Sequence, residues 1–255
     1  MVKVIKYVVY DIIRNRFVIS YSLLLLVMSL SFFGFESDPN KGLLSMLNII
    51  LMVVPLVSII FSTIHFYNSY EFLELLSAQP MSRKTIFFSQ YLGVCISLSL
   101  AFLFGVGLPT YIFEGSERGF TLISSGLLLT LIFVSIAFFA SVFTRDKAKG
   151  IGIALGLWFY LCLLYDGLVL SALLTLSDYP MEKASLVFTA FNPTDLARIL
   201  VLMKLDVSAL MGITGAVFQN FFSSKIGISV AFFLLILWII IPIAWAFKLF
   251  NKKDL

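Results

Sequence analysis

The sequence has few of the residue types from which catalytic and metal sites are built. It contains one histidine, His65, and two cysteines, Cys95 and Cys162. Each cysteine stands alone in an apolar run, without the CxxC spacing of a metal site. The methionines between residues 178 and 225 also lack the close spacing of a soft-metal site. We therefore expect no metal site in this chain and packing roles for these side chains.

Sequence motifs of catalysis and nucleotide binding are absent as well. The chain has no GxSxG or HExxH motif and no pair of acids within an apolar run. It also has no GxxxxGKS or GxxxxGKT motif, so it cannot bind a nucleotide through a P-loop. These absences predict a chain that is not an enzyme and has no cofactor of its own.

Charged residues are scarce too. Only 13% of the 255 residues are charged and 60% are hydrophobic, whereas about a quarter of a soluble domain is charged. This composition indicates an integral membrane protein. Because one span needs about 20 apolar residues, the length allows about six helices in a single domain, 1–255. The net charge is +4, and the basic residues lie beside the apolar runs, which favours contact with the lipid bilayer and not with nucleic acid.

The apolar runs predict an all-α fold with six membrane-spanning helices. The expected spans are residues 17–35, 43–66, 88–113, 120–144, 150–177 and 226–247. Before them, residues 1–16 carry apolar side chains on one helical face and basic side chains off it. We interpret this segment as an amphipathic helix in the membrane interface. The alternative is an N-terminal extension of the first span.

The lysines and arginines predict the orientation of the spans. Of the 18, twelve lie at the two termini and in the loops on the same side, and six lie on the other side. This excess marks the cytoplasmic side, so we expect a multi-pass protein of the cell inner membrane with both termini in the cytoplasm. The segment 67–88 then lies on the cytoplasmic side, and the segment 178–225 lies on the outer side.

The segment 67–88, between the second and third spans, is amphipathic. Asn68 and Glu71 have the spacing of a capping box, which predicts a short helix from Asn68 to Ala78. Ser82 is the expected N-cap of the following helix. A helix of this length cannot span a bilayer, so we expect it to contact a soluble partner. Its acids and its apolar stripe are Glu71, Glu74, Phe72, Leu73, Leu75 and Leu76.

The segment 178–225 contains a second helix signal. Asn192 occupies an N-cap position, Pro193 the first helical position and Asp195 the third. We expect a helix over 193–204 that lies on the outer surface of the bilayer. Its apolar stripe consists of Leu196, Ile199, Leu200 and Met203.

Asp166 is the one ionisable residue in the middle of an expected span. A lone carboxylate in hydrocarbon costs about 3 kcal/mol, so such residues face protein or water. Asp166 either lies on a translocation path or a subunit interface, or it accepts a hydrogen bond from a neighbouring helix. A third alternative is a position nearer the outer membrane interface. Gly152 and Gly156 form a GxxxG pair in the same span, which favours close helix packing.

The order of these parts resembles the membrane subunit of an ABC-2-type ABC transporter. The residues that carry the resemblance are Glu71, Glu74, Leu75, Leu76, Pro80, Arg83 and Lys84. In that family the short acidic helix after the second span couples the membrane domain to an ATPase. The resemblance implies a homodimer with two copies of an ATP-binding subunit, which holds the ATP and Mg²⁺. It also implies that the ATPase contacts Asn68, Glu71, Phe72, Glu74, Leu75 and Leu76.

Within that family, most of the chain is similar to the permeases that serve copper-site maturation of nitrous oxide reductase. The similar segments are residues 152–159, 166–170 and 191–195, together with Arg198. This likeness implies copper or a sulfur species as cargo and a periplasmic maturation protein as partner. That partner would dock on Asn192, Pro193, Asp195 and Arg198. Asp166, Gly152 and Gly156 would line a pathway or the dimer interface.

Two other functions fit parts of the sequence. A generic ABC-2 exporter of a lipid, drug or polysaccharide would share everything except the likeness in the fifth span and residues 191–195. A membrane scaffold without transport would have no ATPase partner and would tolerate substitutions in the segment 67–88.

Overall fold

The computed structural model describes residues 2–36, 38–77, 81–175, 187–205 and 225–252. Within these ranges the regular structure is helical throughout, which confirms the all-α class. The helices are α1 (Val2–Ile13), α2 (Arg16–Phe35), α3 (Pro39–Asn68), α4 (Tyr70–Ser77), α5 (Arg83–Phe102), α6 (Leu108–Phe113), α7 (Glu117–Phe143), α8 (Lys147–Phe159), α9 (Tyr165–Thr175), α11 (Pro193–Lys204) and α13 (Lys225–Lys252). Two short π-helical segments, η1 (Leu103–Gly107) and η2 (Tyr160–Leu164), join α5 to α6 and α8 to α9.

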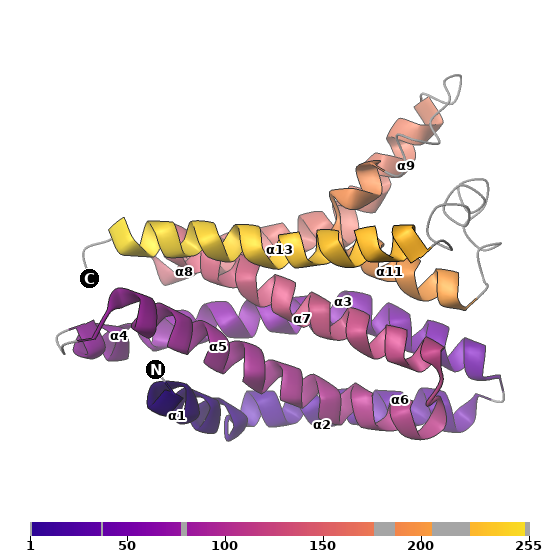
Figure 1. Cartoon of the computed structure of the whole chain (residues 1–255), viewed down its shortest axis with the longest axis horizontal. Helices are drawn as coiled ribbons and strands as arrows, with labels where there is room; N and C mark the ends of the chain where they lie inside the picture. The colour runs from indigo at the N-terminus through magenta and orange to yellow at the C-terminus, as the bar shows by residue number, and fades with distance from the viewer. Residues whose placement is uncertain (1, 37, 78–80, 176–186, 206–224, 253–255) are drawn as a thin grey trace.

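Six helical stretches are long and apolar enough to cross a membrane, as the sequence predicted. They cover Arg16–Phe35, Asn40–Asn68, Arg83–Phe113, Glu117–Phe143, Lys147–Ala172 and Gly227–Lys252. Figure 1 shows most of them side by side along the long axis of the molecule, with α9 leaving the bundle at an angle. The start of α1, helix α4 and the end of α13 lie together at one end of the bundle (Figure 1).

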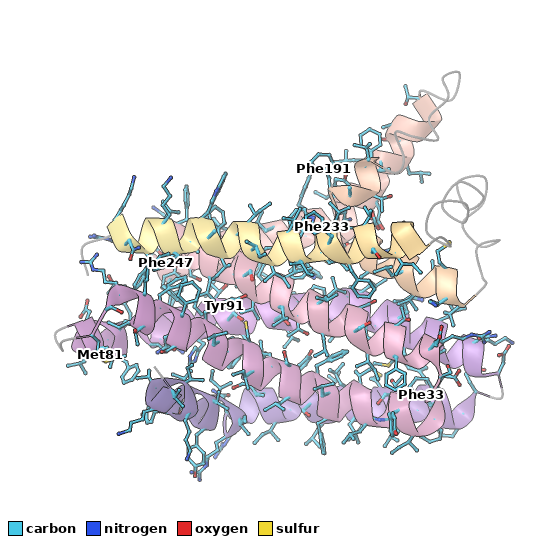
Figure 2. The ribbon with its side chains drawn as sticks, viewed as in Figure 1. Phe33, Met81, Tyr91, Phe191, Phe233 and Phe247 are labelled. Carbon is cyan, nitrogen blue, oxygen red and sulfur yellow. The ribbon has the colours of Figure 1, made fainter. Side chains whose placement is uncertain are left out.

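Helix α7 is the centre of the bundle and packs against α3, α5, α11 and α13. Its Phe138 is fully buried and meets the rings of Phe87 and Tyr91 edge to face. Tyr91 and Phe247, which are labelled in Figure 2, are among the side chains that fill the space between α5, α7 and α13. Aromatic side chains bury a large apolar area each, so this contact is a main source of the cohesion of the bundle.

The N-terminal helix α1 is separate from the first span. The chain breaks at Asn15, whose side chain accepts a hydrogen bond from the N–H of Phe17 and caps α2. The alternative of a continuous extension of the first span is therefore wrong. The buried side chains of Val8 and Ile12 lie on the face of α1 that packs against α5. The membrane-interface position of α1 stays a prediction.

The third span is interrupted at η1 because of Pro109. Proline has no N–H, so the carbonyl of Gly105, four residues earlier, lacks its helical donor. The hydroxyl of Ser29 in α2 donates to that carbonyl at 2.7 Å. A side chain at residue 105 would collide with Leu25 in α2, so glycine allows the close approach. The polar group freed by Pro109 thus fixes α2 against the third span.

Candidate functional site

The structure has a short helix between the second and third spans, α4, but it begins later than the capping-box spacing predicted. Asn68 is the last residue of α3, and the chain turns at Ser69. The side chain of Asn68 accepts a hydrogen bond from Lys147 at 2.8 Å, so it does not cap α4. The prediction that Asn68 starts the helix is wrong because α3 continues through Tyr67. The hydroxyl of Tyr67 donates to the carbonyl groups of Ser141 and Thr144 near the end of α7.

Helix α4 has one face fixed to its own bundle and one face open. Leu73 and Leu76 are buried, with exposed fractions of 1% and 7%. Phe72 is half-buried and its ring stacks on Tyr7 of α1, with centroids 5.6 Å apart. The opposite face presents the exposed residues Glu71, Glu74 and Leu75, and 67% of Leu75 is exposed. Phe72 and Leu76, which the family resemblance assigned to the ATPase contact, therefore point to the chain's own core.

The following helix begins as the sequence predicted. Ser82 is the N-cap of α5, and its hydroxyl accepts a hydrogen bond from the N–H of Thr85 at 3.3 Å. This cap gives α5 a defined start after Pro80, which lies outside the described residues together with 78 and 79.

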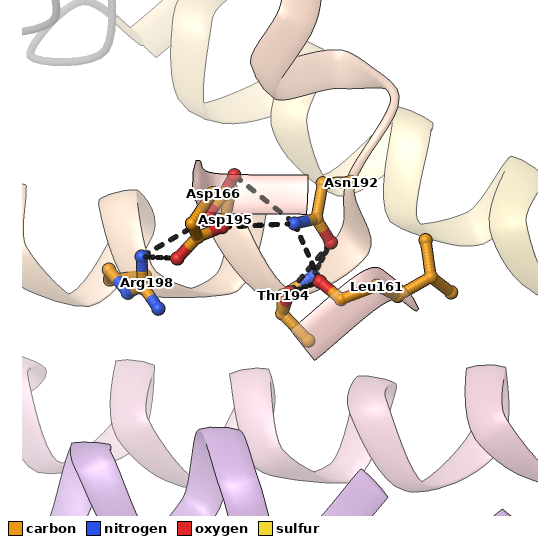
Figure 3. Close-up of polar contacts among 6 residues, drawn as sticks. All are labelled: Leu161, Asp166, Asn192, Thr194, Asp195 and Arg198. Atoms are coloured by element: carbon orange, nitrogen blue, oxygen red, sulfur yellow. Dashed lines mark hydrogen bonds and ion pairs between the residues drawn. The ribbon is translucent and has the colours of Figure 1, made fainter. Parts of the chain in front are cut away.

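A polar cluster joins two parts of the chain that the sequence pointed to separately. Asp166 lies in the first turn of α9, and Asp195 and Arg198 lie on α11. Arg198 Nη1 donates to Asp166 Oδ2 at 2.7 Å and to Asp195 Oδ1 at 3.1 Å (Figure 3). One guanidinium thus bridges two carboxylates from different helices. The interpretation of Asp166 as a residue satisfied by a neighbouring helix is confirmed, and a pathway role stays a prediction.

Asn192 connects this cluster to the π-helical segment η2. Its side-chain oxygen, Oδ1, caps α11 by accepting a hydrogen bond from the N–H of Thr194 at 3.1 Å, as the sequence predicted. Its amide group donates to the carbonyl of Leu161 at 2.9 Å and to Asp195 at 3.2 Å (Figure 3). In an unbroken α-helix the carbonyl of Leu161 would accept from the N–H of Tyr165, which here bonds to Tyr160 instead. The π-helical segment therefore presents a carbonyl to Asn192.

Helix α11 has the predicted limits, but its apolar stripe contacts protein. It packs against α7 and α13 and also touches α3. Leu196, Ile199 and Leu200 are buried and Met203 is half-buried. The expectation that this stripe would face the bilayer surface is therefore wrong, because α7 and α13 leave a place for it in the bundle.

Two further hydrogen bonds hold the chain just before α11. The hydroxyl of Tyr165 donates to the carbonyl of Phe188 at 2.6 Å, and the indole N–H of Trp238 donates to the carbonyl of Ala190 at 3.2 Å. Neither side chain belongs to a motif that predicts a hydrogen bond. Their positions in apolar runs carry no local signal of a partner more than 20 residues away.

Burial alters the electrostatics of the cluster. The pKa of Asp195 is raised to about 7: burial and the nearby charge of Asp166 raise it, and Arg198 opposes them. The side chains of Asp166 and Arg198 are about one third exposed and that of Asp195 is 15% exposed. In the described residues no group of three or more histidine, cysteine or acidic side chains is placed to hold a metal. The cluster can fix α9 to α11 and can hold a proton on Asp195.

The glycines of α8 differ sharply in their surroundings. A side chain at Gly150 would collide with the ring of Tyr67, so this glycine allows α3 and α8 to pack closely. At Gly152 and Gly156 nothing lies within 4 Å of an added Cβ atom. The close packing that the GxxxG pair predicted is therefore absent within the described part of this chain.

The family model for ABC-2 family transporter proteins matches residues 3–255. The chain belongs to the ABC-2 transporter family. Two curated relatives in this family are each described as a probable ABC transporter permease protein NosY. The one from Pseudomonas aeruginosa is 28% identical over 269 residues, which covers 96% of this chain and 95% of the relative. The one from Stutzerimonas stutzeri is also 28% identical, with 95% of each chain covered.

Membership of the ABC-2 family indicates what the six spans belong to. The chain is the permease-type membrane subunit of an ABC transporter, and an ATP-binding ABC protein is its implied partner. Helix α4, between the second and third spans, then becomes the candidate contact for that partner. In Figure 1, α9 and α11 lie in the half of the molecule away from α4.

Proposed function

We propose that this permease couples ATP hydrolysis in a separate ATPase subunit to transport, or to a conformational signal, across the inner membrane. The observation that carries the proposal is the two-sided character of α4. Leu73 and Leu76 fix the helix to the bundle, while Glu71, Glu74 and Leu75 stay exposed. A helix held in this way presents a small acidic and apolar surface to a partner and passes any displacement to its own bundle.

The contacts of α4 define a route for that displacement. When the ATPases close around ATP, they would move α4 as a rigid unit. The stack of Phe72 on Tyr7 would carry the movement to α1, which packs on α5. The turn at Ser69 would carry it to α3. In this proposal two copies of the chain form the membrane core, and each copy binds one ATPase.

For the specific role we propose copper-site maturation of nitrous oxide reductase. The support is the similarity to the two permeases named NosY over nearly the whole chain. A periplasmic maturation protein would contact the region around the start of α11. Of the predicted contact residues, Asn192 and Pro193 are buried and Asp195 is only 15% exposed. We therefore assign the contact to Arg198 and to the exposed Phe191. The cargo would be copper or a sulfur species that this subunit does not itself ligate.

The test of the coupling role is a triple substitution on the open face of α4. The variant Glu71→Ala, Glu74→Ala, Leu75→Ala removes the exposed contacts and leaves Leu73 and Leu76 in place. The control variant Ile112→Ala, Glu114→Ala removes an apolar and an acidic side chain at the opposite end of the bundle. Each tagged chain is purified from its native membrane in mild detergent, and the proteins retained with it are quantified by mass spectrometry.

We expect the α4 variant to lose the ATPase by about tenfold or more, since exposed hot spots cost at least 1–2 kcal/mol each on truncation. The control should retain it. Retention of the ATPase and of stimulated hydrolysis by the α4 variant would contradict the coupling role.

The same purification separates the proposed role from that of a generic ABC-2 exporter. A periplasmic copper-maturation protein retained with the unmodified chain supports the specific role. An ATPase without such a protein favours an exporter of another cargo. No ATPase with the unmodified chain would favour a scaffold.

A further inference from the structure

A groove of about 780 Å³ runs along one side of the bundle, between α2 and the third span. Its floor is made of small side chains, among them the buried Ser97, Ala101 and Gly107. Its rims are large exposed side chains, such as Ile19 of α2 and Phe104 of η1. The hollow arises because small residues on the third span face the gap that large residues border.

The chemistry of the groove suits hydrocarbon. Two serines line it, and both hydroxyls already have partners within the chain: Ser22 donates to the carbonyl of Ala101 and Ser97 to that of Gly93. A polar ligand would therefore lose its own hydrogen bonds on entering. The lining from Ser97 to Tyr111 extends about 20 Å along the third span, at 1.5 Å per residue. One leaflet of a bilayer core is about 15 Å thick, so an extended acyl chain fits this length.

Positive charge lies at one end of the groove. Ile13 lines that end, and the exposed Arg14 and Arg16 follow within three residues of it in the chain. The guanidinium of Arg14 lies over the ring of Tyr10 and donates to its hydroxyl at 2.9 Å, which holds it beside α1. Guanidinium groups bind phosphate oxygens through two parallel hydrogen bonds. The apolar groove therefore suits an acyl chain, and the positive charge at its end suits an anionic head group attached to that chain.

We propose that the groove binds an anionic phospholipid, with an acyl chain along α2 and the third span and the head at Arg14 and Arg16. The groove lies in two of the membrane-spanning stretches, where acyl chains surround the protein. Helices α2 and α6 lie along the lower edge of the molecule in Figure 1, whereas α9 leaves its upper edge. In the proposed homodimer, a second copy seated on the face of α8 where Gly152 and Gly156 are open would leave this groove to lipid.

Two variants and one control test the proposal on the full chain, purified from native membranes in mild detergent. Arg14→Gln with Arg16→Gln removes the charge, and Ala101→Leu fills the floor. Lys3→Gln with Lys6→Gln makes an equal change of charge on exposed residues of α1 outside the groove. Native mass spectrometry counts the phospholipids retained per chain, before and after titration with dioleoyl phosphatidylglycerol or dioleoyl phosphatidylcholine.

We expect the unmodified chain and the lysine control to retain phosphatidylglycerol in preference to phosphatidylcholine. The arginine variant should lose that preference by about tenfold or more, since each cation near an anionic surface contributes about a factor of five. The variant Ala101→Leu should lose the retained lipid while keeping its elution volume and helix content. Equal retention by the arginine variant and the lysine control, or no preference for the anionic lipid, would overturn the proposal. A fall in dimer content for Ala101→Leu without loss of lipid would instead assign the groove to a second copy.

Discussion

At the scale of single residues, the balance of charge around Arg198 decides how α9 and α11 are joined. One guanidinium bridges the carboxylates of Asp166 and Asp195, at 2.7 and 3.1 Å. If both acids are ionised, the cluster carries one negative charge in excess. Burial of Asp195 and this excess of negative charge both favour its neutral form, in agreement with its raised pKa.

Removing the guanidinium should destabilise the protein in a way that a second substitution relieves. Arg198→Gln leaves two carboxylates close together, and we expect a loss of about 1–3 kcal/mol, less than for a fully buried pair because the side chains are one third exposed. Adding Asp195→Asn removes one of the charges, so the double variant should lose less than the sum of the single variants. Thermal unfolding of the four proteins in one detergent measures this coupling. Additive losses would show that the two residues do not interact.

The stability of this junction should depend on pH. The pKa of Asp195 is raised in the folded protein, so its contribution to stability is complete below the unfolded value near 3.9 and is lost as the pH rises through about 7. We expect the unfolding temperature of the unmodified protein to fall between about pH 5 and pH 7.5 and to level off above that range. The fall should be smaller in Asp195→Asn, because an amide does not titrate. A parallel fall in both proteins would show that another group is responsible.

At the scale of elements, the two π-helical segments are stabilised by the same kind of contact. In each, a main-chain carbonyl accepts a hydrogen bond from a side chain of another element. Gly105 in η1 accepts from Ser29 of α2, and Leu161 in η2 accepts from Asn192 before α11. A π-helical segment in a membrane helix is tolerable where a neighbouring element satisfies the backbone groups that it releases. These two contacts therefore set where α2 and α11 attach.

The contact at η1 can be tested with two serines on one helix. Ser29→Ala removes the donor to Gly105, and Pro109 offers no N–H in its place, so we expect a loss of about 1–3 kcal/mol for an unsatisfied buried carbonyl. Ser31→Ala is the control, because its hydroxyl bonds to Val27 of its own helix and is exposed to the outside. Thermal unfolding of both variants gives the difference. An equal effect of the two substitutions would mean that Ser29 does not support η1.

At the scale of the whole molecule, the chain leaves one side of the fifth span without a packed neighbour among the described residues. Gly152 and Gly156 lie there with open space above them, next to exposed residues such as Leu155 and Phe159. Small residues at this spacing allow the backbones of two membrane helices to approach closely. We therefore place the interface of the proposed homodimer on this face.

Bulky side chains at these glycines should weaken the dimer and leave the fold intact. We expect Gly152→Leu with Gly156→Leu to lower the dimer fraction about fivefold or more, since helix contacts of this kind contribute about 1 kcal/mol each. Gly34→Leu is the control, because Gly34 of α2 also has open space around it. Cross-linking in native membranes, read by mass spectrometry, measures the dimer fraction. An unchanged dimer, or an equal loss with Gly34→Leu, would place the interface elsewhere.

The sequence by itself determined the features that depend on local physics. The six spans follow from runs of apolar residues, because a bilayer of fixed thickness demands a minimum length of helix. The caps at Ser82 and Asn192 follow from side chains that reach N–H groups only two or three residues away. The helix between the second and third spans was expected for the same reason, and it is present as α4.

Only the tertiary structure decided which distant parts meet. Asp166 and Arg198 lie 32 residues apart, and nothing in either segment identifies the other as its partner. The spacing of Asn68 and Glu71 suited a cap, but the hydrogen bonds of Tyr67 to the end of α7 kept α3 helical through Asn68. The stripe on α11 could face lipid or protein, and the place between α7 and α13 settled it. Local patterns specify helices and their ends, whereas the partner of each face depends on packing across the whole bundle.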